Sequence, residues 1–221
     1  MTIPLGILAS SGASKISSEF IGSFEDDGGT FPLIAGVDIG SPGLVVVAFH
    51  SEGPENEYVQ INGVQAERAV AGYDLGQDAN ISIYYREVLG TSTIDVLAPS
   101  GASRRAVASI WRIDNYTNPV HQFSYLDNSV PPTSTQSVTT ATLTEPSIVI
   151  AAMSNATGVS DTGTVTWTGI NEDYDTNTSE GGSIFSGAST FSDPGAALTI
   201  SVSLDPGPIV GDGSMGVAIW R

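Results

Sequence analysis

The sequence predicts an all-β protein, with the strands arranged as a β-sandwich or jelly roll. Short runs of alternating or fully apolar residues are separated by clusters of Gly, Pro, Asn and Asp. No segment keeps the helical period of 3.6 residues over three turns. The 25 Gly and 12 Pro are spread along all 221 residues, and only 14% of the residues are charged, a composition typical of β-sandwiches and not of helical bundles.

The expected strands follow one another at intervals of roughly 8 to 14 residues, which favours a sandwich or jelly roll over a propeller. In chain order they are Leu44–Phe49, Val59–Val64, Ser82–Tyr85, Thr93–Val96, Ala106–Arg112, Ile148–Met153, Val165–Ile170, Ser183–Ser186, Thr199–Val202 and Ile219–Arg221.

An internal repeat accounts for the order of these strands. Pro42 and the apolar run after it resemble Pro146 and its following run, at an offset of 104 (146 less 42). Later landmarks recur at offsets near 106, and each half ends on Ile-Trp-Arg, at 110–112 and at 219–221. Collinear matches of this kind indicate a duplication. We therefore expect two half-repeats, 37–112 and 141–221, joined by a linker over 113–140.

Residues 1–34 lack this pattern, so we expect an N-terminal arm followed by one sandwich domain over 35–221, in which the halves pair as facing sheets. Two tandem small sandwiches are the alternative, but each half alone would bury little apolar surface. The apolar arm residues either complete the chain's own sheet or anchor the chain to another subunit. They are Ile3, Leu5, Ile7 and Leu8.

The charge balance restricts the partners. Seven Lys and Arg against 24 Asp and Glu give a net charge of −17, which opposes binding to nucleic acid or to an anionic membrane. The absence of Cys removes disulfides and thiolate chemistry. No apolar run reaches the roughly 18 residues of a membrane helix, and no basic residue precedes the apolar start, so we expect neither a membrane span nor a signal peptide.

No catalytic motif is apparent, and we expect the protein not to be an enzyme. The two histidines are His50, expected to face a loop at a strand end, and His121, and no Gly-x-Ser-x-Gly elbow accompanies them. A glycoside hydrolase would need two carboxylates, such as Glu172 and Asp173, but acidic loop residues are usually solvated. We expect no cofactor, with calcium at Glu172, Asp173 and Asp175 as the one metal to consider.

The aromatic residues allow two interpretations. If Ile110 and Ile219 belong to the core, Trp111 and Trp220 point to the opposite strand face and cover it. Alternatively, aromatic faces could stack on sugar rings. The candidates for such stacking are Trp111, Trp167, Trp220, Tyr84 and Tyr85.

Several segments resemble accessory virion proteins of tailed bacteriophages, a group that includes head-decoration, tail and fibre components. The segments are Thr2–Ala9, Leu44–Phe49, Val59–Ala66 and Ser109–Arg112. The resemblance rests on strand signatures over about Val37–Arg221 and the start, and on no catalytic motif.

The resemblance implies a β-sandwich that assembles in many copies on a particle, with other virion proteins as partners and a homo-oligomer, such as a trimer, as the assembling unit. The implied function is a non-enzymatic structural component of the virion, assembled in the host cytoplasm. The alternative is a carbohydrate-binding module for receptor recognition, which would attach the particle to a glycan of the host surface.

Overall fold

The computed structural model describes residues 14–26, 34–52, 58–72, 79–97, 105–127, 135–156, 164–177, 183–205 and 212–221. All regular structure in these ranges is β-strand, which confirms the predicted all-β class. These ranges accordingly contain no helix that could cross a membrane.

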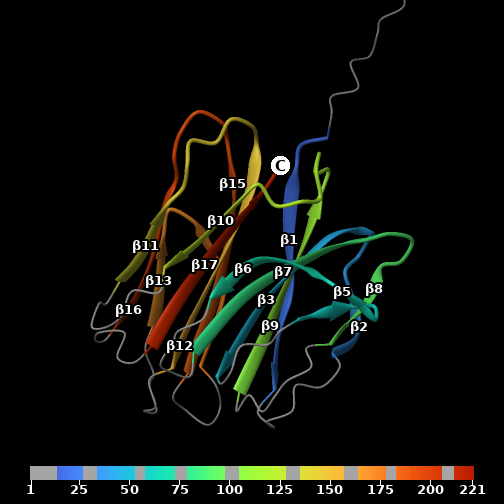
Figure 1. Cartoon of the computed structure of the whole chain (residues 1–221), viewed down its shortest axis with the longest axis horizontal. Helices are drawn as coiled ribbons and strands as arrows, with labels where there is room; N and C mark the ends of the chain where they lie inside the picture. Colours follow the sequence, from blue (N-terminus) through green and yellow to red (C-terminus); the bar gives the residue numbers. More distant parts are fainter. Residues whose placement is uncertain are drawn as a thin grey trace, which may run out of the picture.

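The first half of the chain forms two antiparallel sheets (Figure 1). The larger sheet, sheet A, has the order β1-β9-β3-β7-β6, with bounds β1 Ser17–Asp26, β3 Gly43–Glu52, β6 Glu67–Gly72, β7 Ala79–Val88 and β9 Arg105–Asp114. The smaller sheet, sheet B, has the order β2-β8-β4-β5, with bounds β2 Ile34–Asp38, β4 Gln60–Ile61, β5 Val64–Gln65 and β8 Thr93–Leu97. Between them lies an apolar cluster that includes Val47, Phe49 and Ile110.

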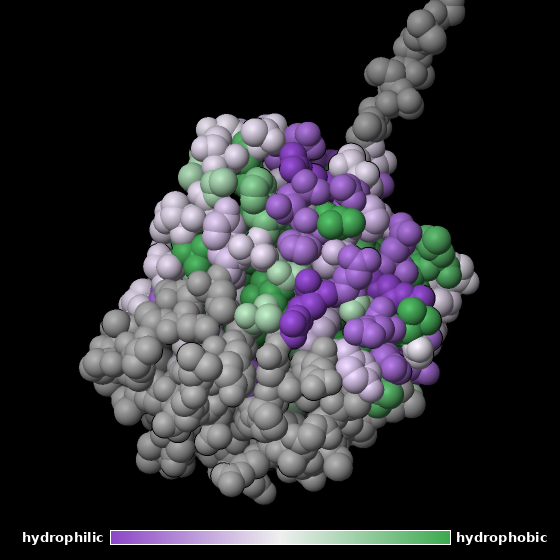
Figure 2. Space-filling model, viewed as in Figure 1, coloured by the Kyte–Doolittle hydropathy of each residue, from purple (hydrophilic) through white to green (hydrophobic). Residues whose placement is uncertain are grey.

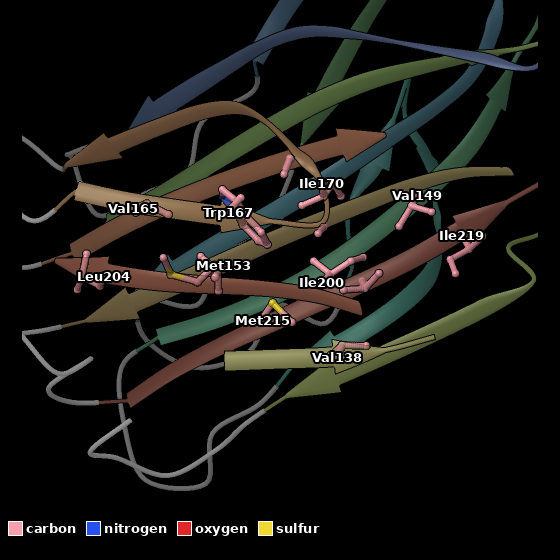
Figure 3. Close-up of a cluster of buried hydrophobic side chains, with 14 of the residues drawn as sticks. Val138, Val149, Met153, Val165, Trp167, Ile170, Ile200, Leu204, Met215 and Ile219 are labelled. Carbon is pink, nitrogen blue, oxygen red and sulfur yellow. The ribbon is translucent and has the colours of Figure 1, made fainter. Parts of the chain in front are cut away.

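The second half also forms two antiparallel sheets. The larger sheet, sheet C, has the order β10-β17-β12-β15-β14, with bounds β10 Phe123–Asp127, β12 Ser147–Ala156, β14 Asn171–Asn177, β15 Ser183–Ser192 and β17 Asp212–Trp220. The smaller sheet, sheet D, has the order β11-β16-β13, with bounds β11 Thr135–Thr139, β13 Thr164–Thr168 and β16 Thr199–Asp205. Figure 3 shows the cluster between them, which includes Trp167, Ile200 and Met215.

Sheets A and C pack against each other through their remaining faces. The cluster between them includes Val46, Ile83, Trp111, Ile150 and Trp220. Period-2 alternation explains this arrangement, since successive side chains of β3, β9, β12 and β17 enter different clusters. The molecule is therefore a stack of sheets in the order B, A, C, D. This differs from the expectation that each half would supply one facing sheet, because each half supplies two.

The two halves share a topology. When only the five strands of each larger sheet are counted in chain order, sheets A and C have the same order, 1-5-2-4-3. The strands β3 and β12 begin 104 positions apart, at Gly43 and Ser147 (147 less 43). A β-bulge interrupts β6 between Arg68 and Val70, and another interrupts β14 between Glu172 and Tyr174, again 104 positions apart (172 less 68). The jelly roll and the duplication themselves remain predictions.

The strand pairing corrects one detail of the predicted repeat. Ile113 pairs with Leu44, whereas Trp220 pairs with Ile148, the residue that corresponds to Leu44. Trp220 therefore corresponds to Ile113, and the two Ile-Trp-Arg segments are shifted by two residues. An even shift preserves the strand face. Both Trp side chains therefore enter the cluster between sheets A and C, while Ile110 and Ile219 enter the outer clusters, as the core interpretation predicted.

Part of the expected arm belongs to the sandwich. Residues 17–26 form β1, which pairs along its length with β9, and Ile16 is buried between sheets A and C. The boundary at residue 34 was therefore wrong for this stretch, because Phe20, Ile21 and Phe24 pack against the apolar clusters. The arm residues Ile3, Leu5, Ile7 and Leu8 lie outside the described residues.

Two glycines of sheet C leave space for neighbouring side chains, among them Trp111 and Val70 of sheet A. A Cβ at Gly187 would lie 2.4 Å from Cε1 of Tyr174 and 2.9 Å from Cη2 of Trp111. A Cβ at Gly216 would lie 2.9 Å from Cγ1 of Val70. Because packed interiors tolerate little added volume, these glycines set how closely the two sheets approach.

The Gly216–Val70 contact gives a direct test of this packing. We expect Gly216→Ala to lower the free energy of unfolding by about 1–3 kcal/mol, the usual range for overpacking. Val70→Ala should also destabilise the protein, because it leaves a cavity. The double variant should lose less than the two single losses together, as measured by urea denaturation in a double-mutant cycle. Additive losses would mean that the two residues do not share one space.

Candidate functional site

The five aromatic residues predicted to stack on sugars lie in the interior. Trp111, Trp167, Trp220, Tyr84 and Tyr85 are between 0 and 8% exposed. The Nε1 of Trp111 donates to Asp173 at 2.7 Å, and the Nε1 of Trp167 donates to Ser186 at 2.7 Å. At these exposures none of the five rings offers a free face to a sugar, so the structure contradicts the alternative that they stack on sugars and agrees with their use in the core.

A polar network crosses the interface between sheets A and C, with His50 at its centre. His50 belongs to β3, where it continues the inward-facing series of Leu44, Val46 and Ala48, and it is fully buried. Its Nδ1 lies 3.1 Å from the carbonyl oxygen of Met153, and its Nε2 lies 2.6 Å from the hydroxyl of Tyr174. The expectation that His50 faces a loop was therefore wrong, although its role is structural.

The partners of His50 fix its tautomer. The Met153 carbonyl can only accept, so Nδ1 carries the proton and donates. Nε2 then has a free lone pair and accepts from the Tyr174 hydroxyl, whose oxygen accepts in turn from Ser109. The same Nδ1 proton is shared with the hydroxyl oxygen of Ser154 at 3.0 Å, and the Ser154 hydroxyl donates in turn to the carbonyl oxygen of Asn80 at 2.9 Å. The network thus joins strands of both halves with each proton assigned.

Burial determines the charge state of this network. Desolvation lowers the pKa of His50 to about 3, against the smaller opposing effect of its hydrogen bond to the Met153 carbonyl. Desolvation also raises the pKa of Tyr174 well above its usual value. Both groups are therefore neutral at physiological pH, so the network holds the sheets together without charge.

The β-bulge in β14 places the residues that meet Trp111 and His50. Glu172 pairs with Ala188 and Tyr174 pairs with Gly187, so Asp173 is the additional residue. Asp173 accepts from Trp111, and Tyr174 reaches His50 while stacking on Phe20 with ring centroids 5.3 Å apart. Two consecutive side chains thus contact sheet A, which strict alternation would not allow. Desolvation raises the pKa of Asp173, opposed by hydrogen bonds from Ser189 and Trp111.

The same bulge separates the three residues considered for calcium. Glu172 and Asp175 pair with Ala188 and Ser186, which face sheet D, whereas Asp173 contacts Trp111 of sheet A. Within the described ranges, no three His, Asp or Glu side chains gather as metal ligands. The acidic side chains that the sequence places together are therefore divided between two faces of the strand.

A groove with polar and apolar lining opens beside Asp173, where β1, β12, β14 and β15 meet. Its volume is about 410 Å³. It is lined by Lys15, Ile16, Ser17, Ser18, Ile148, Asn171, Asp173, Ser189, Thr190 and Phe191. The Lys15 ammonium lies 3.4 Å from the centroid of the Phe191 ring, and the Asn115 side chain donates to the Lys15 carbonyl at 3.1 Å. The segment leading into β1 is therefore held against sheet C.

The topology of the halves explains why this groove is open. Ser189 pairs with Ile150, as Tyr85 pairs with Val46 at the corresponding place in sheet A. Tyr85 donates to Glu67 at 2.6 Å and packs against both His121 and Trp220. A tyrosine and a histidine thus occupy this position in the first half, whereas a serine leaves space in the second.

Sequence reasoning missed both the network and the groove. Period-2 alternation from Leu44 could have placed His50 on an interior face. The bulge that turns Asp173 and Tyr174 toward sheet A could not be recognised from the order of the residues. The groove could not be predicted because it is lined by residues more than 150 positions apart in the sequence, such as Lys15 and Ser189.

His50 should make stability depend on pH. Its pKa is lower in the folded state than in the unfolded state, so between about pH 6.5 and 3 only the unfolded chain gains its proton. Stability should therefore fall with decreasing pH, by up to about 1.4 kcal/mol per pH unit from this residue. We expect urea denaturation between pH 7 and 4 to show a smaller slope for His50→Gln than for the unmodified protein.

His121 provides the matched control, because burial also lowers its pKa but the residue is only half-buried. His121→Gln should retain most of the slope. An unchanged slope in His50→Gln would contradict the assignment of a neutral, buried His50.

The chain was also compared with known proteins. No protein-family model matches it, and neither a curated protein nor a solved structure does.

Proposed function

We propose that this chain is a non-enzymatic structural component of a tailed-phage virion, a surface decoration or a tail- or fibre-associated protein that works as a homo-oligomer. The observation that carries the proposal is that the side chains best suited to catalysis or binding are used to hold the structure together. His50, Tyr174, Trp111 and Asp173 all hold sheets A and C together. A stack built in this way suits a rigid component whose role is assembly.

The surface agrees with such a role. The net charge of −17 keeps copies soluble before assembly. On the face drawn in Figure 2, apolar residues of the described part form small separate patches among hydrophilic ones. The edge strand β1 has exposed Glu19 and Glu25 and a bulge between Phe20 and Gly22, features that hinder uncontrolled pairing of strand edges. Assembly would then depend on specific contacts.

The resemblance to accessory virion proteins is the second support. It is the reason why the proposal names the virion of a tailed phage. The competing function, a carbohydrate-binding module for host attachment, relied on five aromatic residues that are buried. It would have to use another surface.

Quantitative mass spectrometry of purified virions, relative to the major capsid protein, tests the proposal. Abundance similar to that of the capsid protein would support a decoration role, and abundance similar to that of tail components would support a tail or fibre role. Absence from the particles would overturn the proposal.

Removing residues 1–13 should separate folding from assembly. The cut precedes Ile16, which is buried, and leaves β1 intact, so the truncated protein should keep its thermal unfolding temperature. We expect it to be lost from particles, because the apolar residues Ile3, Leu5, Ile7 and Leu8 are the proposed anchor. Particle content is measured by the same mass spectrometry.

A full-length control replaces those four residues with Ser, which keeps the length of the arm and removes its apolar character. Normal incorporation of both variants would show that the arm is not the anchor.

A further inference from the structure

We propose that the groove between β1 and β15, defined by the lining residues given above, binds a neutral carbohydrate. The site does not use the buried aromatic residues, and it does not depend on the virion role, so either proposal can fail alone.

The volume of the groove fits a small ligand. About 410 Å³ lies within the range of roughly 300–1,000 Å³ found for small-molecule sites. The groove is open to solvent at the edge of the sheets, so a mono- or disaccharide unit at the end of a longer glycan could enter it.

The hydrogen-bonding groups suit hydroxyls. Asn171 offers both donors and acceptors, Ser18, which pairs with the inward-facing Ile113, offers a hydroxyl that does both, and Asp173 accepts only. A sugar hydroxyl also donates and accepts, so a ring with several hydroxyls can use these groups together. Phe191 and Ile148 add apolar atoms to the lining, against which C–H groups of the sugar can pack.

The charges favour a neutral ligand. Of the lining residues, Lys15 carries a positive charge and Asp173 a negative one, so the groove has no net charge. Lys15 is already engaged with the Phe191 ring at 3.4 Å, and Asp173 is already engaged with Trp111 at 2.7 Å. Neither charge is free to bind a counterion without losing a contact.

The groove is also preorganised. The bulge and the Trp111 hydrogen bond hold Asp173 in place, and the bond from the Asn115 side chain holds the Lys15 backbone. Fixed polar groups lose less entropy when a ligand binds. At the position in sheet A that corresponds to Ser189, Tyr85 packs against His121 and fills the space.

The test is two-dimensional NMR of the ¹⁵N-labelled full chain, titrated with glucose, galactose, N-acetylglucosamine, maltose and lactose. We expect at least one sugar to shift amide signals of Ser17, Asn171 and Ser189–Phe191. No shift with any of the five sugars, or shifts confined to other parts of the molecule, would overturn the proposal.

Galacturonic acid and glucosamine test the charge argument in the same assay. We expect both to bind more weakly than the neutral sugar of the same ring. Preferential binding of either charged sugar would overturn the assignment of a neutral ligand.

Two variants test the location. Ser189→Tyr introduces the side chain that occupies the corresponding position in sheet A, and it should abolish the shifts. Asn171→Ala removes exposed hydrogen-bonding groups and should weaken binding by about 2- to 10-fold, the usual effect of one hydrogen bond. Because Asn171 is exposed, this variant should fold even if Ser189→Tyr does not.

The matched control is Thr166→Tyr, which places the same side chain on an exposed position of β13. It should bind as the unmodified protein does. Unchanged binding in both Ser189→Tyr and Asn171→Ala would overturn the proposed site.

Discussion

The packing of sheet A on sheet C is the constraint on which the rest of the molecule depends. Each half can cover one face of its larger sheet with its own smaller sheet, but the other face is also apolar. Burial of that second face against the other half joins the two sandwiches into one stack. The Trp residues serve this contact from both sides, with Trp111 approaching Gly187 and Trp220 packing on Tyr85. Because Trp111 and Tyr174 together fill the space at Gly187, the contact also fixes how the halves are aligned.

Hydrogen bonds add direction to this apolar contact. An apolar interface resists separation but tolerates sliding, whereas the chain from Ser109 through Tyr174 and His50 to Met153 requires one alignment of the sheets. Loss of one member would leave buried polar groups without partners, at a cost of about 1–3 kcal/mol each. The network is therefore best understood as a device for specificity of packing, with a dependence on pH as its consequence.

The sequence was sufficient for the class of the fold because class depends on local pattern. Alternation in β3, β9, β12 and β17 indicated strands, and it also placed Ile110 and Trp111 on opposite faces, as the structure has them. It was insufficient for the number of sheets in each half, because alternation gives two faces to a strand and does not identify what covers each face. Asp173 and Tyr174 were unpredictable for a different reason. Their direction depends on one additional residue in a ladder, and a bulge is determined by pairing between strands and not by the residues of one strand.

The same reasoning explains where function can reside on this molecule. Aromatic residues suggested a binding surface from the sequence, but a chain with few large apolar side chains needs those residues to fill its clusters, and Trp111, Trp167 and Trp220 are all used there. A ligand can therefore be bound only by surface residues that the packing of the clusters does not require. In the second half that surface includes the position where Ser189 replaces the larger Tyr85 of the first half. The larger sheets of the two halves have the same strand order but differ in side-chain volume at this one position, while the contact between sheets A and C stays closed.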